Sequence, residues 1–397
     1  MRVVRILHVF KDQKFFDSFS NKYDNIPSFH NLYYFYTSNK NYEFKYIKNK
    51  WKIIVIHNRS EYLKLFSSKD IDVILFHSFS VKFYGLFKYI NKEKIVIWWS
   101  WGGDIYNKSF DILPPLIKHE LYKPLTKEYI NKQKRAFYFS FSSIRHFAKL
   151  FLFPYYKFLQ YRSVKRTDYF IPCMSLDYKL LKEQCNFFRA KLFPIARPRF
   201  ESNFVFHEKA GHVLIGNSLT YTNNHLDIFE KIYQYQLKMG RKYIVPVSYG
   251  WGKAFDNNPD NLITRSKLRC NDVVWLRDYL DRDEYFKIFD NVTHAIFGVL
   301  RQQALGNIYE CLRKGIKVFL YKDSVVADQL KEDGYIFYTI DDDLTESSLA
   351  ECLPRDEALH NYSLFKLMAL NDNIDVVENK LQEIMQNSIT STDLTIK

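Results

Sequence analysis

The sequence predicts an α/β protein built from two halves, each a parallel β-sheet with helices on both faces. Two observations predict it: short apolar runs alternate with amphipathic ones, and the alternation starts a second time near His212. A strand, a helix and a second strand in succession typically form a parallel sheet covered on both sides. With 397 residues, 47% hydrophobic and 26% charged, the chain is long enough for two folded domains.

The first half carries four buried-strand patterns and two amphipathic helix patterns. We expect strands at "RILHVF" (5–10), "KIIVIH" (52–57), "DVILFHSF" (72–79) and "KIVIWWSWGGD" (94–104), with helices at "SEYLKLFSS" (60–68) and "VKFYGLFKYINK" (81–92).

The second half repeats this alternation. We expect strands at "HVLIGNS" (212–218), "KYIVPVSYGWG" (242–252), "VVWL" (273–276), "THAIFGVL" (293–300) and "IKVFLYK" (316–322), with helices over 224–238 and 261–269, from 282, and over 304–314.

The stretch 195–211 lacks periodicity and contains Pro198, so it reads as the linker between the halves. We therefore predict a domain over 1–200, a second over 201–375, and a C-terminal helix end and tail over 376–397.

Cysteine use and the N-terminus bear on location. Five scattered cysteines with no CxxC pair argue for reduced thiols and against a disulfide framework or structural zinc. The opening "RVVRILHVF" is a strand pattern rather than a signal peptide. No window reaches the roughly 18 uncharged apolar residues that span a bilayer. We expect a cytoplasmic protein that is soluble or bound to a surface.

Positive charge is concentrated in one segment. The chain carries a net charge of +14, and residues 107–166 hold 13 Lys or Arg against three acids. Within this segment, aromatic and basic residues alternate at near-helical spacing from Asn131 onward. Such a pattern suits an element lying on an anionic membrane; a pair of helices with a solvated basic face is the alternative, and nucleic-acid binding is less favoured. The predicted membrane-binding residues are Lys134, Arg135, Arg145, Lys149, Phe151, Phe153, Lys157, Arg162, Lys165 and Arg166.

Polar and glycine residues recur where the apolar strands end. Ligands of open parallel sheets bind beyond the carboxyl ends of the strands, so we expect these residues to form two lips of one cleft. In the first half they are His8 with Asp12, His77 with Ser78, and the run 98–104; in the second half they are the runs 216–218, 248–250 and 301–303.

The stretch "GNSLTYTNNH" (216–225) joins a strand to a helix. Its backbone N–H groups and hydroxyls suit a phosphate at a helix N-terminus. The alternative is a simple turn in which Asn223 or Asn224 caps the helix. It is neither GxGxxG nor a P-loop, so neither of those nucleotide sites is supported.

Four residues are candidates for the chemistry. Arg301 starts a polar turn between a strand and a helix, and a guanidinium matches phosphate oxygens bidentately. Asp104 has the chemistry of a general base, as do His8 and His77. For Asp104 the alternative is to cap the next turn, and for each histidine it is a structural place at a strand end.

The acidic run "IDDDLTES" (340–347) superficially offers a metal motif. It lies between a strand pattern and a helix pattern, so Asp342 or Asp343 reads as a helix N-cap instead. No other group of residues has metal-ligand spacing, and we expect neither a metal nor a cofactor.

Two similar α/β halves facing one another are the plan of GT-B glycosyltransferases and of few other folds. The chain also resembles glycosyltransferase family 56 over nearly its whole length, most strongly from Val213 to Tyr321. The segment between Tyr106 and Arg166 is longer and more basic than is usual in that family. The motifs that carry the resemblance are "ILHVF", "LFHS", "IWWSWGGDIY", "IGNSLTYTNNH", "YIVPVSYG", "DRDEYFKIFDNVTHAIFGVLRQQALGN", "GIKVFL" and "IFYTIDDDL".

The resemblance implies a metal-independent enzyme at the cytoplasmic face of the bacterial inner membrane. It would move a 6-deoxy amino sugar such as 4-acetamido-4,6-dideoxygalactose, or a fucose-like sugar, from a dTDP or UDP donor. The acceptor would be an undecaprenyl-diphosphate-linked saccharide of O-antigen or capsule synthesis. His8, His77 and Asp104 would line the acceptor side. The donor side would be lined by Gly216, Asn217, Ser218, His225, Pro246, Tyr249, Arg301, Gln302, Gln303 and Gly306.

The competing hypothesis is a non-catalytic basic protein that binds a membrane or RNA. Stabilisation of the fold by dTDP or UDP favours the transferase, whereas strongly salt-dependent RNA binding favours the alternative.

Overall fold

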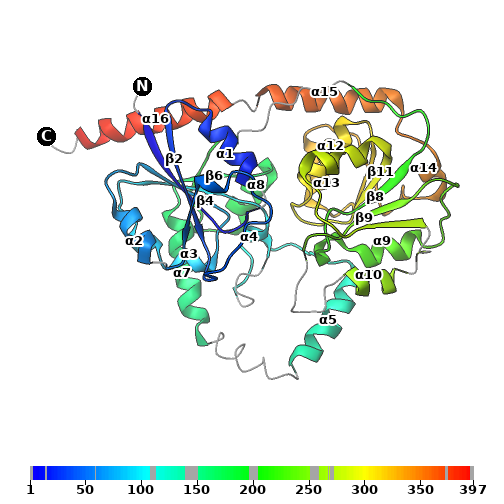
Figure 1. The fold of residues 1–397 in the computed structure, drawn as a ribbon, viewed down its shortest axis with the longest axis horizontal. Coiled ribbons are helices and arrows are strands. Elements are labelled where there is room, and N and C mark those ends of the chain that lie inside the picture. Colours follow the sequence, from blue (N-terminus) through cyan, green and yellow to red (C-terminus); the bar gives the residue numbers. More distant parts are fainter. Residues whose placement is uncertain are drawn as a thin grey trace. The chain divides into compact units, whose positions relative to one another are not determined.

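The computed structural model describes residues 3–13, 16–58, 60–107, 113–138, 151–195, 204–250, 259–266, 268, 272–371 and 374–393. It divides into two compact units (Figure 1). Unit 1 comprises Met1–Lys118, Lys149–Phe200 and Ala369–Lys397, and unit 2 comprises His119–Ala148 and Glu201–Met368.

Unit 1 is built on a seven-stranded parallel sheet with the order β3-β2-β1-β4-β5-β6-β7. Its strands are β1 Val4–Phe10, β2 Phe29–Tyr36, β3 Ile53–Ile56, β4 Val73–His77, β5 Ile95–Trp99, β6 Tyr169–Ile171 and β7 Lys191–Leu192. Its helices are α1 Phe16–Asp24, α2 Ser60–Ser67, α3 Val81–Tyr84, α4 Gly103–Tyr106, α7 Phe153–Arg166, α8 Ser175–Gln184 and α16 Ile374–Asp393, with short 3₁₀ turns at Lys50–Lys52 and Phe87–Tyr89.

Unit 2 is built on a six-stranded parallel sheet with the order β10-β9-β8-β11-β12-β13. Its strands are β8 His212–Ile215, β9 Tyr243–Pro246, β10 Val273–Leu276, β11 Val292–Phe297, β12 Lys317–Leu320 and β13 Tyr338–Thr339. Its helices are α5 Pro124–Tyr138, α9 His225–Ile232, α10 Pro259–Arg265, α11 Arg282–Ile288, α12 Leu305–Arg313, α13 Val325–Glu332, α14 Glu346–Ala350 and most of α15 Arg355–Asn371, with 3₁₀ turns at Tyr221–Asn223 and Phe289–Asn291.

The predicted fold class is therefore observed, because every paired strand in both sheets is parallel. The sequence prediction omitted β2, whose "FHNLYYFY" contains a histidine, an asparagine and three tyrosines and is only half buried, and it omitted α1, α8 and the short strands β6 and β7. The helix expected over 224–238 ends early, at Ile232. The described part of the predicted linker, residues 195 and 204–211, contains no helix or strand.

The compact units differ from the predicted domain boundaries in two places. The stretch His119–Ala148 is grouped with unit 2, although it lies within the predicted 1–200 domain. The expected tail at 376–397 is grouped with unit 1, because most of it forms α16. The apolar side chains Val377, Leu381, Ile384 and Met385 of this helix join the core formed by β1, β2, β4 and β5.

We expect Leu381→Ala to lower the free energy of unfolding of unit 1 by about 2–5 kcal/mol, because a buried leucine leaves a cavity when it is truncated. Leu381 is 1% exposed. Val376→Ala on the same helix is the control: Val376 is 44% exposed, and its loss changes stability by no more than about 0.5 kcal/mol. Urea unfolding of both variants measures these changes. Equal losses of stability in the two variants would contradict the packing of α16 on the core of unit 1.

Candidate active site

The strand order of unit 2 has a switch point between β8 and β11, where ligands of such sheets bind. The loop after β8 (216–224) and the loop after β11 (298–304) meet there. A Cβ on Gly298 would lie 2.3 Å from the carbonyl oxygen of Asn223, so only glycine allows the two loops to approach this closely.

The loop after β8 is a closed turn held by one asparagine. Gly216 has φ 67°, and a Cβ there would lie 2.7 Å from Nε2 of His225. The Asn223 side chain accepts from the Asn217 N–H (3.3 Å) and donates to the Ser218 carbonyl (2.8 Å). Asn223 is fully buried, so these bonds are shielded from water and keep the loop in one conformation.

Gln303 ties the second loop to the first. Its amide nitrogen donates to Oδ1 of Asn217 (3.2 Å) and to Oγ1 of Thr220 (3.0 Å), and its oxygen accepts from Thr222 (2.6 Å). The two polar stretches that lie about 85 residues apart in the sequence thus form one hydrogen-bonded surface.

Arg301, Gln302 and His225 lie beneath this surface and are at most 8% exposed. Arg301 donates to the Gln302 carbonyl (2.6 Å). Within the described residues, Oε1 of Gln302 and Nε2 of His225 are buried without a hydrogen-bond partner. A buried polar atom without a partner is costly, so these two atoms are candidates for contact with a bound ligand.

α12 begins directly after this turn. Ala304 takes the left-handed conformation (φ 60°) that starts the helix, and a Cβ on Gly306 in its first turn would meet no atom within 4 Å. The helix N-terminus is therefore open enough for a phosphate to approach the backbone.

The adjacent strand β9 adds a third loop. Pro246 ends β9, and the carbonyl of Tyr249 accepts from the Leu219 N–H (2.7 Å), which joins this loop to the first one. All ten predicted donor-side residues therefore lie at the carboxyl edge of the unit 2 sheet: Gly216, Asn217, Ser218, His225, Pro246, Tyr249, Arg301, Gln302, Gln303 and Gly306.

Asp104 lies at the corresponding edge of unit 1 and organises the loop after β5. One carboxylate oxygen accepts from the Phe79 N–H (2.9 Å) and from Nε1 of Trp98 (2.7 Å). The other accepts from Ser100 Oγ (2.9 Å) and from the Trp101 N–H (3.1 Å). These four bonds match the acceptor capacity of a carboxylate. Asp104 therefore holds the loop after β5 and the start of the loop after β4, rather than capping the next turn as the alternative had it.

His8 and His77 form a buried pair in unit 1. His8 lies inside β1 rather than at its end, and His77 ends β4. Nδ1 of His8 is 3.0 Å from Nε2 of His77, and the two residues are 0% and 1% exposed. Phe19 stacks on the His77 ring at 3.9 Å. The pair is therefore part of the aromatic core of unit 1.

The hydrogen bonds also determine the tautomers. Asn31 must donate its amide to the acceptor-only carboxylate of Asp24 (3.2 Å), so its oxygen faces Nε2 of His8 (3.0 Å) and accepts a hydrogen bond from the N–H there. Nδ1 of His8 then accepts from Nε2–H of His77. Nδ1 of His77 is left as a buried lone pair without a partner among the described residues.

The aspartates of the acidic run 340–347 do not cap the helix that follows it. The N-cap of the helix after the acidic run is Thr345, which accepts from the Ser348 N–H, so the prediction of Asp342 or Asp343 was wrong. Asp343 instead accepts from Thr339, and Asp342 pairs with Lys322.

Within the part of the chain that the structure describes, no group of three His, Cys, Asp or Glu is placed to hold a metal.

Asn224 takes the N-cap position of α9, but its side chain does not cap the helix. It has a left-handed backbone (φ 50°) and bonds outside its own turn, to the 121–123 stretch and to Gly298. Sequence reasoning missed this function, since nothing in "TNNH" distinguishes it from an ordinary cap.

The predicted membrane segment is described only in part. Arg145 and Lys149 lie outside the described residues, as do the side chains of Lys134 and Arg135. On α7, aromatic and basic side chains pair four residues apart: Phe153 with Lys157, Phe158 with Arg162, and Tyr161 with Lys165. No described helix has the length and apolarity needed to cross a bilayer.

Exposure on α7 follows the predicted pattern with one exception. Of the predicted residues, Lys157, Arg162 and Lys165 on α7 are exposed, as is Phe151 just before the helix (87%), whereas Phe153 is only partly exposed. Tyr155 and Phe158, which were not predicted, add exposed rings on α7 (57% and 52%). Arg166 is different, because it bonds Asp168 (2.7 Å) and the Lys94 carbonyl (2.7 Å) and so supports the fold of unit 1.

Solved structures share this fold over nearly the whole chain. The N-terminal domain of a Candida albicans trehalose-6-phosphate phosphatase has a TM-score of 0.60 at 10% identity, covering 96% of each chain. The sucrose-phosphate synthase of Thermosynechococcus elongatus has a TM-score of 0.57 at 10% identity, covering 98% of this chain and 100% of its own. An E. coli trehalose-6-phosphate structure bound with UDP-2-fluoro glucose has a TM-score of 0.57 at 12% identity, with 96% and 99% covered. The fold is GT-B.

The protein is a GT-B glycosyltransferase, since a glycosyltransferase family match accompanies this fold. Residues 166–360 match the family model described as 4-alpha-L-fucosyltransferase glycosyl transferase group 56, which confirms the predicted resemblance to family 56. No curated protein matches the chain.

Four buried histidines make stability depend on pH. Burial lowers the pKa of His8 to about 4, that of His225 to about 3 and that of His294 to about 4, and burial together with His8 lowers the pKa of His77 well below its ordinary value. Between pH 6.5 and those values the unfolded chain binds more protons than the folded one, so stability falls on acidification. The slope is about 1.4 kcal/mol per pH unit for each histidine.

Urea unfolding from pH 7 to 4.5 measures this slope. We expect His225→Gln to reduce it for unit 2, while His30→Gln leaves it nearly unchanged, because His30 is exposed. Stability that is flat or rises on acidification would contradict neutral buried histidines.

Proposed function

We propose that this glycosyltransferase moves a 6-deoxy amino sugar, such as 4-acetamido-4,6-dideoxygalactose, or a fucose-like sugar from a dTDP or UDP donor. The proposed acceptor is a polyprenyl-diphosphate-linked saccharide of bacterial surface polysaccharide synthesis. The matched family is described as a fucosyltransferase, which supports a deoxy sugar. One solved neighbour is bound with a UDP sugar, which supports a nucleotide-linked donor.

The observation that carries the proposal is the surface formed by the 216–224 and 298–304 loops. It joins an arginine, an open helix N-terminus and two buried polar atoms without partners. This combination suits a diphosphate attached to a sugar, since phosphate oxygens accept from the guanidinium and the backbone.

In the proposed reaction, an acceptor hydroxyl attacks the anomeric carbon and the bond from that carbon to the diphosphate oxygen breaks. The nucleoside diphosphate leaves with the electron pair. Arg301 and the N-terminal amides of α12 stabilise the charge that develops on it. His225 is neutral, so it contributes a hydrogen bond rather than a charge.

The acceptor proton requires a base when the anomeric carbon is inverted. Asp104, His8 and His77 are the predicted candidates. Their hydrogen bonds favour His77, because Asp104 already accepts four bonds and both nitrogens of His8 are engaged. His8, Asn31 and Asp24 would then act as positioning residues that keep Nδ1 of His77 unprotonated.

We expect Arg301→Ala to keep the fold and to lose turnover by about 10²–10³-fold, the usual effect of removing a donor aimed at developing charge. Arg301→Lys should recover only part of it, because an ammonium does not bind two phosphate oxygens as a fork. Arg277→Ala is the control, since Arg277 forms an exposed pair with Asp260 in the same unit.

The assay is release of nucleotide from a panel of dTDP- and UDP-sugars, with urea unfolding to show that each variant is folded. Full activity in folded Arg301→Ala would remove Arg301 from the mechanism.

The exposed surface of α7 supports a peripheral location at the cytoplasmic face of the inner membrane. Aromatic rings and basic groups are paired along this helix, which suits insertion among anionic head groups. Lys88 and Tyr89, on the turn that packs against α7, add a further pair at 4.6 Å.

We expect the protein to bind phosphatidylglycerol vesicles and to bind phosphatidylcholine vesicles much less. Each basic residue near such a surface contributes about 1 kcal/mol, so Lys157→Gln, Arg162→Gln and Lys165→Gln should each weaken binding about fivefold. Lys69→Gln, on a loop outside α7, is the control. Co-sedimentation at two salt concentrations measures this, and salt-independent binding would argue against the proposed surface.

A further inference from the structure

A stretch from the first half of the sequence is built into unit 2. We call residues His119–Gln133 the strap; it consists of an extended stretch and the first part of α5. Unit 1 supplies the chain on both sides of it, up to Lys118 and again from Lys149. The strap lies outside residues 166–360, the part of the chain that matches the family model.

The first contact is with Asn224. The Lys123 N–H donates to Oδ1 of Asn224 (2.8 Å), and the amide nitrogen of Asn224 donates to the Leu121 carbonyl (3.3 Å). The same nitrogen donates to the carbonyl of Gly298 (2.6 Å). Asn224 is fully buried, so one side chain joins the strap to both loops of the candidate donor site.

The second contact is with Asp227 in the first turn of α9. Its carboxylate accepts from the Leu125 N–H (2.9 Å), from the Thr126 N–H (3.0 Å) and from the Thr126 hydroxyl (2.6 Å). Asp227 thus caps the N-terminus of α5 from a different helix, and its charge is favourable there. Thr126 is 2% exposed, so these bonds are protected from water.

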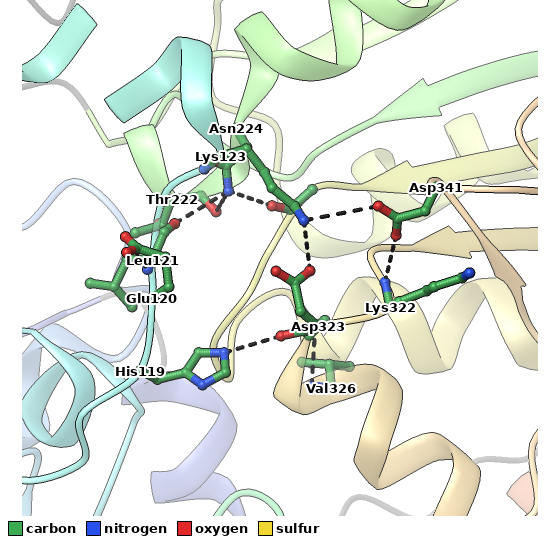
Figure 2. Close-up of polar contacts among 12 residues, drawn as sticks. His119, Glu120, Leu121, Lys123, Thr222, Asn224, Lys322, Asp323, Val326 and Asp341 are labelled. Atoms are coloured by element: carbon green, nitrogen blue, oxygen red, sulfur yellow. Dashed lines mark hydrogen bonds and ion pairs between the residues drawn. The ribbon is translucent and has the colours of Figure 1, made fainter. Parts of the chain in front are cut away.

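The third contact is with the loop after β12 (Figure 2). Nζ of Lys123 pairs with Asp323 (2.8 Å) and lies 4.2 Å from the centre of the Tyr321 ring, while the His119 ring bonds the Asp323 carbonyl (3.1 Å). Asp323 is 55% exposed, so this ion pair adds less than the buried bonds. Two residues further on, the Val325 N–H donates to the carbonyl of Leu300, the residue before Arg301 (2.9 Å).

Tyr122 of the strap lies within electrostatic range of Arg301. Burial raises the pKa of Tyr122, and the positive charge of the nearby Arg301 opposes that rise. The strap therefore contacts the loop after β8 and the loop after β12, and Asn224 links it to the loop after β11.

We propose that the strap is a wall of the nucleotide-diphosphate site and that Thr126, Asn224 and Asp227 are positioning residues for the loops that bind the donor. This inference rests on the proposed function. Asn224 lies between Asn223 and His225, so the strap bonds to Asn224 act on the residues that shape the 216–225 loop, and those to Asp227 hold the helix that follows it. The donor site of unit 2 is then incomplete without a segment encoded within the first half of the chain.

The test measures the dissociation constants of dTDP and UDP for the full-length chain, together with hydrogen exchange of the amides at 217–224. Asp227→Ala removes the acceptor of three strap bonds. Thr126→Val removes one of them, and Thr126→Ser retains it. Asp328→Ala is the matched control, because Asp328 is also an acid in the first turn of an eight-residue helix of unit 2, but it is exposed and belongs to α13 rather than α9.

We expect Asp227→Ala to weaken nucleotide binding about tenfold and to speed exchange at 217–224, with exchange in β8 and β11 unchanged. Thr126→Val should weaken nucleotide binding and speed exchange in the same direction but less. Thr126→Ser and Asp328→Ala should resemble the wild type in both measurements. If the wild type binds nucleotide and Asp227→Ala binds equally well, the strap inference is overturned and the proposed function stands. If the wild type binds neither nucleotide, the proposed function fails and the inference fails with it.

Discussion

The buried hydrogen bonds of Asn224 are the constraint on which the candidate site depends. A left-handed asparagine at the start of α9 turns its side chain away from its own helix and toward the strap and Gly298. Leaving one of these buried groups unpaired costs about 1–3 kcal/mol, so the hydrogen bonds of Asn224 hold the three segments together. The close contact between Gly298 and the Asn223 carbonyl follows from the same arrangement. The site is thus a junction of loops, each stabilised by the others.

In unit 1, too, a few buried polar side chains hold the strands and their loops, but they are a carboxylate and two histidines instead of an amide. Asp104 uses a single carboxylate to hold the loop after β5, and the His8–His77 pair fills the aromatic core between β1 and β4. Polar groups at a sheet edge therefore do not all serve ligands. Asp104, with four bonds to its carboxylate, stabilises the loop, whereas His77, His225 and Gln302 each keep a buried atom without a hydrogen-bond partner among the described residues.

Much of the fold could be predicted from the sequence, because the apolar and polar patterns that indicate strands and helices are local. Apolar runs bounded by Gly, Asn and Ser located most strands of unit 2 to within a few residues, and the positions of Gly216, Arg301 and Gln303 followed as strand exits. β2 was missed because its histidine, asparagine and three tyrosines make it less apolar than the other strands, although it pairs with β1 over seven residues. The N-cap at Thr345 was missed because three nearby aspartates are equally suitable N-cap residues.

The sequence by itself determined the class of fold, the glycosyltransferase resemblance and the set of polar loops at one sheet edge, since periodicity and motif spacing encode these along the chain. Only the tertiary structure decided the membership of the strap in unit 2, the docking of α16 on unit 1 and the tautomers of the histidine pair. These depend on contacts between residues such as Thr126 and Asp227, which are about a hundred positions apart. Local sequence does not identify such partners, because many carboxylates along the chain have the chemistry to cap a helix N-terminus. Only the fold decides which of them lies there.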